Sequence, residues 1–307
     1  MNLFGTVLTH TAPSANYRGE SAENRAVIQK ITIGRFEHAF ISPEAMRNAL
    51  RETLKTLGLP CNRERLGDEE QLAVRFQDYP DEEQFADDFF MGWLVAASGK
   101  DREKIRKELK AKGRDPDAFT FKRDSILRMN MAVALEPYRH DAVFTQSPLD
   151  ATDKAVKEHV NDTSSNLLLR ETAVTAYQYP FALNLDDCAP HMDWTRTLLT
   201  AIGELNGVAG NHARSYFEMA PASLVLRLTP RLVAGYDTYG FAIDDGEHRL
   251  KDVVADIING DLPGDEFFLG GKLVKDLGDD QRAALEAAGV TLDRNAQRLL
   301  ATVAERL

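Results

Sequence analysis

Several stretches of the chain carry apolar side chains at the spacing of a strand or a helix. Residues 2–10 have the composition of a β-strand. Residues 42–44, Ser-Pro-Glu, form a helix start, because serine caps the first turn, proline fits its geometry and glutamate suits the positive end of the helix dipole. Leucine or methionine then recurs at helical spacing from Met46 to Leu57, where Gly58 follows. This pattern predicts a helix with one buried stripe.

The rest of the chain alternates between strand-like and helix-like stretches. Strand composition returns at residues 125–135, 165–181 and 223–228. Helical spacing occurs at 191–205, and the tail from Leu262 reads as a loop followed by two short helices, after Gly278 and after Asp293. The order of strand, helix, strands, helix and strand predicts an α+β fold, with a sheet whose helices gather on one face.

Composition places the chain among folded proteins. Hydrophobic residues make up 43% and charged residues 28%, which is the globular range. The longest apolar runs are far shorter than the roughly 18 residues that a membrane span needs, and the first residues lack a basic leader ahead of an apolar core. Two distant cysteines form no disulfide framework. We therefore expect a cytoplasmic protein with reduced thiols and no membrane contact.

Charge is unevenly distributed along the chain. The net charge of −11 argues against general attraction to nucleic acid. Residues 102–128 nevertheless hold ten Lys and Arg against five Asp and Glu, whereas residues 68–88 hold nine acids and one base. Both stretches fall largely in residues 60–117, which read as a mostly helical, highly charged insertion. The basic stretch is either a local site for a polyanion or an ordinary solvated helix face.

Enzyme motifs are missing from the sequence. It contains no P-loop, G-x-G-x-x-G, H-E-x-x-H or G-x-S-x-G motif. Cys188 and His191 have the spacing of two metal ligands, but nothing nearby completes a set of four. His38 and His212 are candidate general bases without an identifiable partner. We therefore predict no catalytic residue, no metal and no cofactor.

Two stretches leave alternatives open. Tyr177, Tyr179 and Phe181 alternate along a predicted strand, where they either stack on unpaired bases or form a core face. Residues 210–214, Gly-Asn-His-Ala-Arg, follow a helix and place amide, imidazole and guanidinium groups on a turn. That turn either holds phosphates through Asn211, His212 and Arg214 or simply ends the helix.

The cations before and within the first helix form the strongest candidate site. Basic side chains lie in and beside the preceding loop, and more follow Ser42 in the first two helical turns. A loop joined to a helix N-terminus supplies cations, a hydroxyl and free N–H groups, which suit a phosphodiester backbone. Neighbouring glutamates are the counter-argument, because they would neutralise most of these cations. The candidate RNA-binding residues here are Asn24, Arg25, Lys30, Arg35, Ser42, Arg47 and Arg51.

At these positions the sequence resembles a known family. Asn24-Arg25, Lys30 and the segment GRFEHAFISPEAMRNALRETL (34–54) resemble the N-terminal signature of CRISPR-associated Cascade backbone subunits of the DevR type, found in type I-B systems. The blocks SILRMNMAVALEPYRHD (125–141) and GNHARSYFEMAPASLVLRLT (210–229) resemble the same family. Together the blocks reach to about Pro230, and the tail beyond it remains unmatched.

The resemblance implies a particular architecture. It implies an RRM-like, ferredoxin-like palm formed by residues 1–59 and 118–307, a helical fingers insertion at 60–117 and a thumb hairpin at roughly 139–170. It also implies that the loop and first helix grip the guide RNA, a role that transfers to Asn24, Arg25, Lys30, Ser42, Arg47 and Arg51. Arg35 and the turn at 210–214 are weaker transfers. The chain lacks the aromatic signature of ordinary RNA-recognition modules.

The implied function is that of a structural RNA-binding subunit. Copies would stack head to tail along crRNA, holding its backbone so that its bases pair with target DNA during antiviral defence. The implied partners are a large subunit, a small subunit and a subunit that caps the 5′ end of the crRNA. Two alternatives remain: an RRM-like endoribonuclease using a His or Asp, and a metabolic protein with no nucleic-acid role.

Overall fold

The computed structural model describes residues 1–14, 17–22, 25–67, 72–146, 167–208, 216–244 and 247–307. Its centre is a nine-stranded, mainly antiparallel sheet. The strand order is β21-β20-β17-β1-β16-β12-β6-β5, and β11 also pairs with β16. The strands are β1 (Asn2–Leu8), β5 (Lys30–Ile33), β6 (Phe36–Ile41), β11 (Arg128–Met129), β12 (Ala132–Ala134), β16 (Tyr177–Asn184), β17 (Ser223–Thr229), β20 (Phe267–Gly271) and β21 (Thr291–Asp293).

The sheet forms because its central strands are apolar on both faces. Alternate side chains of β1, β16 and β17 enter one core, as Leu3, Tyr179 and Leu224 show. Leu8 and Val225, on the same strands, enter a second core on the opposite face. Both faces must therefore be covered. The predicted α+β sheet is found, but the prediction that its helices gather on one face is wrong.

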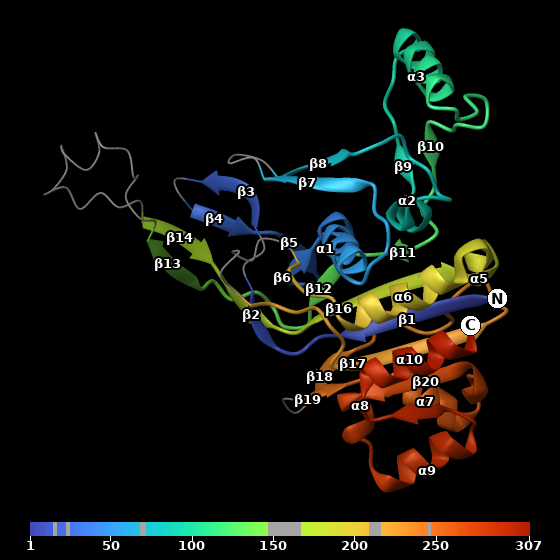
Figure 1. Ribbon diagram of the computed structural model, residues 1–307. Coiled ribbons are helices and arrows are strands. Elements are labelled where there is room, and N and C mark those ends of the chain that lie inside the picture. Colours follow the sequence, from blue (N-terminus) through green and yellow to red (C-terminus); the bar gives the residue numbers. More distant parts are fainter. Residues whose placement is uncertain (15–16, 23–24, 68–71, 147–166, 209–215, 245–246) are drawn as a thin grey trace, which may run out of the picture.

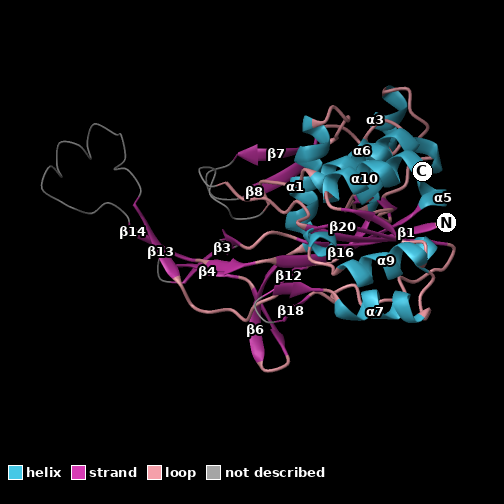
Figure 2. Ribbon diagram, turned by 90° about the horizontal axis from the view of Figure 1, so that it is seen from below, coloured by secondary structure: helices cyan, strands magenta, loops and turns pink. Residues whose placement is uncertain are grey.

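Different helices cover the two faces (Figures 1 and 2). The first core is covered by α1 (Pro43–Thr56), α6 (Met192–Gly203) and α10 (Ala296–Arg306). The second core is covered by α7 (Lys251–Asn259), α8 (Lys272–Lys275) and α9 (Asp279–Ala287). A short helix, α5 (Leu185–Cys188), follows β16. In the described part of the chain, no helix combines the length and apolar composition needed to cross a membrane.

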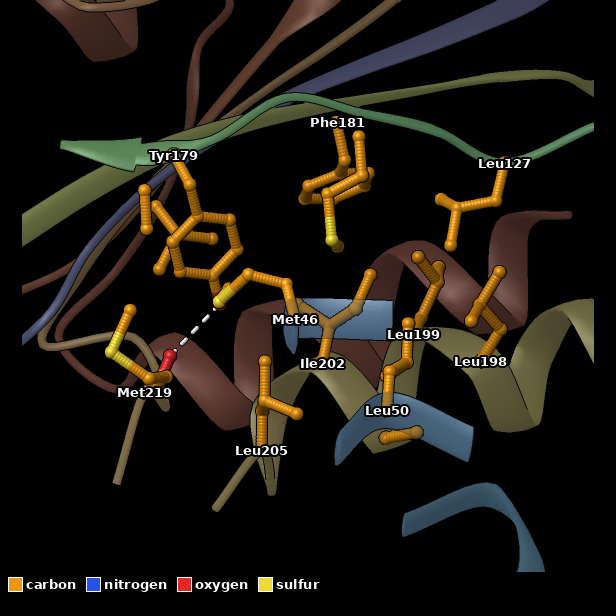
Figure 3. Close-up of a cluster of buried hydrophobic side chains, with 14 of the residues drawn as sticks. Met46, Leu50, Leu127, Tyr179, Phe181, Leu198, Leu199, Ile202, Leu205 and Met219 are labelled. Atoms are coloured by element: carbon orange, nitrogen blue, oxygen red, sulfur yellow. Dashed lines mark hydrogen bonds between the residues drawn. The ribbon is translucent and has the colours of Figure 1, made fainter. Parts of the chain in front are cut away.

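The first core settles the role of the aromatic strand. Figure 3 shows Tyr179 and Phe181 pointing from β16 toward Met46 of α1 and the leucines of α6. The Tyr179 hydroxyl donates to the carbonyl oxygen of Met219 at 2.8 Å, and burial raises the pKa of Tyr179. Tyr177 is also buried, and burial raises its pKa to about 12. These rings are core residues and cannot stack on bases.

A lobe projects from the body between α1 and β11, and we call residues 57–127 the arm. It contains two helices, α2 (Ala86–Met91) and α3 (Gly99–Ala111), with α3 at its far end (Figure 1). It also contains a hairpin of β7 (Arg63–Gly67) and β8 (Leu72–Phe76) and the pair β9 (Trp93–Leu94) and β10 (Lys122–Arg123). The arm is therefore less helical than its charge pattern predicts.

Smaller strands extend from the other end of the sheet. A four-stranded sheet has the order β13-β14-β4-β3, and its outer pair projects from the body in Figures 1 and 2. Its strands are β3 (Tyr17–Ala22), β4 (Arg25–Ile28), β13 (Ala142–Gln146) and β14 (Leu167–Glu171). The remaining pairs are β2 (Ala12–Ser14) with β15 (Ala173–Thr175) and β18 (Ala242–Asp244) with β19 (Glu247–Arg249).

Candidate nucleic-acid interface

The candidate site begins at the N-terminus of α1. Ser42 has extended backbone geometry, and its hydroxyl oxygen accepts a hydrogen bond from the Ala45 N–H at 3.3 Å. Pro43 occupies the first turn and Glu44 adds a favourable charge there. The sequence signal for this helix start is confirmed. Ser42 acts as the cap, so we leave it out of the set of RNA contacts.

Arg47 lies one turn further along α1, half-buried against β11. Its guanidinium donates to the carbonyl oxygen of Leu127 at 3.1 Å, while its Nε atom is buried without a partner in the described part of the chain. Burial is the largest cause that lowers the pKa of Arg47; Glu44 opposes it, and the positive charges of Arg128 and Arg63 add to it. Several guanidinium groups therefore converge at this point.

Arg128 is a candidate site residue that our sequence reasoning missed. It lies on β11 opposite Ala182 of β16, and its side chain is exposed. Its guanidinium has no hydrogen-bond or ion-pair partner among the residues that the structure describes. The segment that contains it resembles the family, but no pattern in the sequence shows that residue 128 would lie beside Arg47. Only the pairing of β11 with β16 under α1 brings the two together.

Arg51 is buried, unlike Arg128, so the prediction that Arg51 contacts RNA is corrected. Its side chain is only 4% exposed, and its Nε lies 3.5 Å from Asp87 of α2. A second guanidinium nitrogen donates to Asn48 at 2.7 Å. Because Arg51 neutralises a fully buried carboxylate, it is unavailable to a phosphate. It fastens the arm to α1 instead.

That fastening is a larger buried network, which we call the arm root: Arg51, Asn62, Arg63, Asp87 and Asp88. Asp87 accepts backbone N–H groups from Asn62 at 2.7 Å and Arg63 at 3.0 Å. Asp88 accepts the Asn62 amide at 2.8 Å, and Arg63 lies 3.6 Å from it. Burial is the largest cause that raises the pKa of Asp88, to about 6.

Lys30 is also held by a carboxylate. Its ammonium lies 3.8 Å from Glu171 and 4.4 Å from the centre of the Tyr138 ring. Glu171 is 4% exposed and also accepts hydrogen bonds from the Tyr138 hydroxyl and the Ile28 N–H, each at 3.1 Å. Lys30 therefore neutralises a buried acid where β14 meets the sheet, which makes it a positioning residue there.

The other predicted residues are dispersed or undescribed. Arg35 lies exposed in the turn between β5 and β6, away from Arg47. Arg25 begins β4, but its side chain lies outside the described part. The other predicted contacts outside the described residues are Asn24, Asn211, His212 and Arg214. Among the members of the predicted set whose side chains the structure describes, only Arg47 thus lies beside another arginine of the surface, Arg128.

The candidate bases and metal ligands have ordinary structural surroundings. His38 bonds through Nδ1 to the carbonyl oxygen of Ala134 at 2.9 Å. The His191 ring stacks on Trp194 with 3.8 Å between ring centres, and Cys188 is buried as a free thiol. Among the described residues, no group of three or more His, Cys, Asp or Glu side chains is placed to hold a metal ion.

Comparison with solved structures identifies the fold. The chain has the mixed α/β fold of a chain in a "CRISPR RNA-guided surveillance complex", with a TM-score of 0.57, 13% identity and coverage of 100% of this chain and 99% of that chain. A chain of a "CRISPR RNA-guided surveillance complex, pre-nicking" matches with a TM-score of 0.61, 11% identity and the same coverage. These two matches show that the protein shares the fold of those chains.

Comparison of sequences is more specific. The "CRISPR-associated protein Cas7/Cst2/DevR" of Myxococcus xanthus (strain DK1622) is 29% identical over 300 residues, which cover 94% of this chain and 92% of that protein. No protein-family model matches the chain. The resemblance to the DevR type is confirmed, and it extends beyond the blocks that first indicated it, into the tail after Pro230.

Proposed function

We propose that this protein is a guide-RNA-binding backbone subunit of a CRISPR interference complex of the Cascade kind. The observation that carries the proposal is similarity along almost the whole chain to a Cas7/Cst2/DevR protein. The shared fold of chains from RNA-guided surveillance complexes supports it. In this role the subunit binds the crRNA, stacks on further copies of itself and contacts the large, small and 5′-end-capping subunits.

The parts of the fold receive roles under this proposal. The nine-stranded sheet with α1 and α6 forms the palm, which we assign to residues 1–59 and 118–307. The arm supplies the fingers, which we assign to residues 60–117. The β13–β14 pair forms the base of the thumb, within residues 139–170. The β13–β14 pair projects from the body, which supports that assignment because a projecting pair of strands can reach a neighbouring copy (Figure 2).

The proposed RNA contacts centre on Arg47 and Arg128. Two guanidinium groups at one surface attract phosphate oxygens, and Arg128, which is exposed and has no partner among the described residues, can offer them hydrogen bonds. Arg25 and Asn24 from the loop, and the turn at 210–214, stay in the proposed set. Contacts of this kind hold the backbone and leave base edges free to pair with target DNA.

The proposed subunit is a binding protein without a catalytic role of its own. Guide pairing supplies the sequence specificity, so the protein needs only sequence-independent contacts. A net charge of −11 is compatible with this role because each copy has to hold only a short stretch of backbone. Nothing in the described geometry favours the endoribonuclease alternative.

The test is RNA binding by Arg128→Ala over a range of salt concentrations, with Lys275→Ala as the matched control. Lys275 is an exposed cation of α8, far from Arg128 in the chain and in the fold. Arg128→Ala should weaken binding equally for RNAs of different sequence and reduce the salt dependence by about 0.7, the value of one phosphate contact on a single strand. Lys275→Ala should change neither.

Two results would contradict the assignment. One is an effect of Arg128→Ala that depends on the RNA sequence while the salt dependence stays as it was. The other is an equal loss for Lys275→Ala, which would mean that general charge rather than this site attracts the RNA. If RNA is turned over instead of bound stoichiometrically, the endoribonuclease alternative replaces the proposal.

A further inference from the structure

A cleft of about 700 Å³ lies where β1 and β16 meet α5, at the end of the sheet that carries the N-terminus (Figure 1). Its apolar lining includes Phe4, Ile126 and Leu232. Its lining also includes Arg128, the exposed arginine of the proposed RNA site. The volume is in the range of a site for a small ligand. The cleft therefore continues the RNA site onto one face of the sheet.

The strand register places an aromatic ring near that arginine. Phe4 of β1 pairs with Ala182 of β16, and Ala182 in turn pairs with Arg128 of β11. Residues paired in this way have their side chains on the same face of a sheet, so the three form one row, with Phe4 and Arg128 about 10 Å apart. The middle residue contributes only a methyl group. A gap therefore lies between the phenyl ring and the guanidinium.

Phe4 lies in the cleft because neither core includes it. Leu8, four residues later on the same face of β1, is buried in the second core. Phe4 belongs to neither of the two cores and is half-buried. Leu232, which also lines the cleft, is 87% exposed. Apolar side chains left open in a concave site are suited to a ligand that covers them.

The free charge of the cleft is positive. Asp186 lies 3.2 Å from the N-terminal ammonium, and Asp124 lies 3.6 Å from Lys122. The negative charge of Asp187 acts on Arg123. Each carboxylate that lines the cleft thus has a cation nearby, whereas the guanidinium of β11 has no partner among the described residues. An anionic group is therefore favoured at the β11 side of the cleft.

The amide side chains of the cleft are already held by the protein. Asn2 pairs with Asn184 in the next row on the same face, and both line the cleft. The Asn2 amide donates to the carbonyl oxygen of Arg231 at 2.9 Å. The Asn184 oxygen accepts the Asp186 N–H at 3.1 Å, and its nitrogen donates to Asp187 at 3.1 Å. We therefore expect the cleft to contact the flat face of a ligand rather than its polar edge.

We propose that the cleft binds one nucleotide of the bound RNA, with its phosphate on Arg128 and its base stacked on Phe4. A nucleotide joins a flat base to an anionic phosphate, which matches an aromatic ring near an unpaired guanidinium. Every base has a π face, so stacking adds affinity without a preference for sequence. The inference rests on the proposed function, since it adds a base contact to a site proposed for phosphates.

Removal of the aromatic ring separates base stacking from phosphate binding. Phe4→Leu keeps an apolar side chain without the flat ring, and it should weaken binding of a short RNA that holds a single copy by at least about fivefold. The salt dependence should stay as it is, unlike that of Arg128→Ala. A ribose-phosphate strand of the same length without bases should bind equally well to Phe4→Leu and to the unaltered protein. The matched control is Phe36→Leu, which alters a phenylalanine that is 60% exposed elsewhere and should change nothing.

A second variant fills the gap and leaves the ring in place. Ala182→Leu adds three carbons between Phe4 and Arg128, at a position that is partly open to solvent. It should weaken binding of the short RNA by a similar factor, while the midpoint of urea unfolding stays unchanged. Ala242→Leu is the control, because Ala242 is an exposed strand residue of β18 outside the cleft.

Three results would overturn the inference. The first is an equal loss of affinity by Phe4→Leu for the short RNA and for the strand without bases. The second is unchanged binding of the short RNA by both cleft variants. The third is unchanged binding of the short RNA together with weaker assembly of several copies on long RNA, which would assign the cleft to a contact between proteins.

Failure of the proposed function would look different. If the unaltered protein binds neither the RNA nor the strand without bases, the RNA-binding proposal is wrong. The cleft is then tested with adenosine monophosphate by equilibrium dialysis. Binding that Phe4→Leu and Arg128→Ala each weaken would still support a nucleotide site there. No binding, or binding that neither variant changes, would overturn the inference as well.

Discussion

The arm root and the tip of the β5–β6 hairpin, residues 33–36, use arginine in opposite ways, and we call the second the hairpin tip. Arg51 in the arm root is 4% exposed and pairs with a buried carboxylate, whereas Arg35 in the hairpin tip is exposed and has no partner among the described residues. Both are candidate RNA contacts on sequence grounds, Arg35 as the weaker of the two, since they lie on either side of the same helix start. A cation beside a helix start is therefore available to a ligand only if no acid from a distant part of the sequence forms an ion pair with it.

The carboxylate that pairs with Arg51 lies well downstream of it in the sequence. Asp87 follows Arg51 by 36 positions and approaches it only because α2 packs against α1. The hairpin tip projects beyond the sheet, so no later segment in the described part covers it. Variants that remove Arg51 and Arg35 in turn should therefore differ strongly in stability.

Arg51→Ala should have the largest effect on stability. It leaves Asp87 with only the more distant Arg63 guanidinium, at 3.9 Å, and two backbone N–H donors. Losing one partner of a buried ion pair costs about 3 kcal/mol of unfolding free energy. The measurement is the urea midpoint of unfolding, with Arg35→Ala as the control, which should stay within about 0.5 kcal/mol of the unaltered protein. Similar midpoints for both variants would mean that the arm root does not stabilise the fold.

The pH dependence of the arm root gives a second, smaller effect. The pKa of Asp88 is raised from 3.8 to about 6, so the folded protein keeps this proton at a pH where the unfolded chain has released it. The stabilising contribution of Asp88 is therefore complete below about pH 4 and is lost as the pH rises through 6. Asp88→Asn cannot ionise and escapes this loss.

The measured quantity is the difference in unfolding free energy between Asp88→Asn and the unaltered protein. It should shift in favour of the variant by about 1–2 kcal/mol between pH 5 and pH 7.5. Arg35→Ala serves as the control, because the hairpin tip contains no acid that titrates in this range. A difference that is constant with pH would show that Asp88 keeps its ordinary pKa.

The same comparison shows how much of the fold the sequence could predict. The strand at residues 2–8, the helix beginning at Pro43 and the helix at 192–203 carry their own period and end signals, and the structure confirms them. β20, by contrast, is five residues with two glycines, and β7 and β8 lie in an acid-rich stretch. These strands exist because a neighbouring strand pairs with them, and local composition does not report such pairing.

The candidate site was predictable to a smaller extent for a related reason. Sequence shows which residues are charged but not which charges meet after folding. Arg47 was found because it lies one turn into a helix with clear end signals. Arg128 was missed because it lies in a two-residue strand, and its position beside Arg47 depends on the pairing with Ala182.

Substitution of Ser42 should have the smallest effect on stability. It also tests whether the Ser42 hydroxyl caps the helix or contacts RNA. Ser42→Ala removes the oxygen that accepts the Ala45 N–H and should cost about 1 kcal/mol of unfolding free energy. Ser42→Asp should restore the stability, because aspartate also caps helices and its charge suits the helix N-terminus. Both values come from urea unfolding.

RNA affinity of the same two variants then decides what the hydroxyl does. If Ser42 is only a cap, Ser42→Asp binds RNA like the unaltered protein, since its carboxylate is occupied by the N–H groups of the first turn. If the hydroxyl touches a phosphate, the added negative charge repels it, and affinity falls even though stability is restored. Because the Ser42 oxygen already accepts a backbone hydrogen bond, we expect restored stability and unchanged affinity. A stable Ser42→Asp variant with weakened binding would return Ser42 to the RNA contacts, beside Arg47.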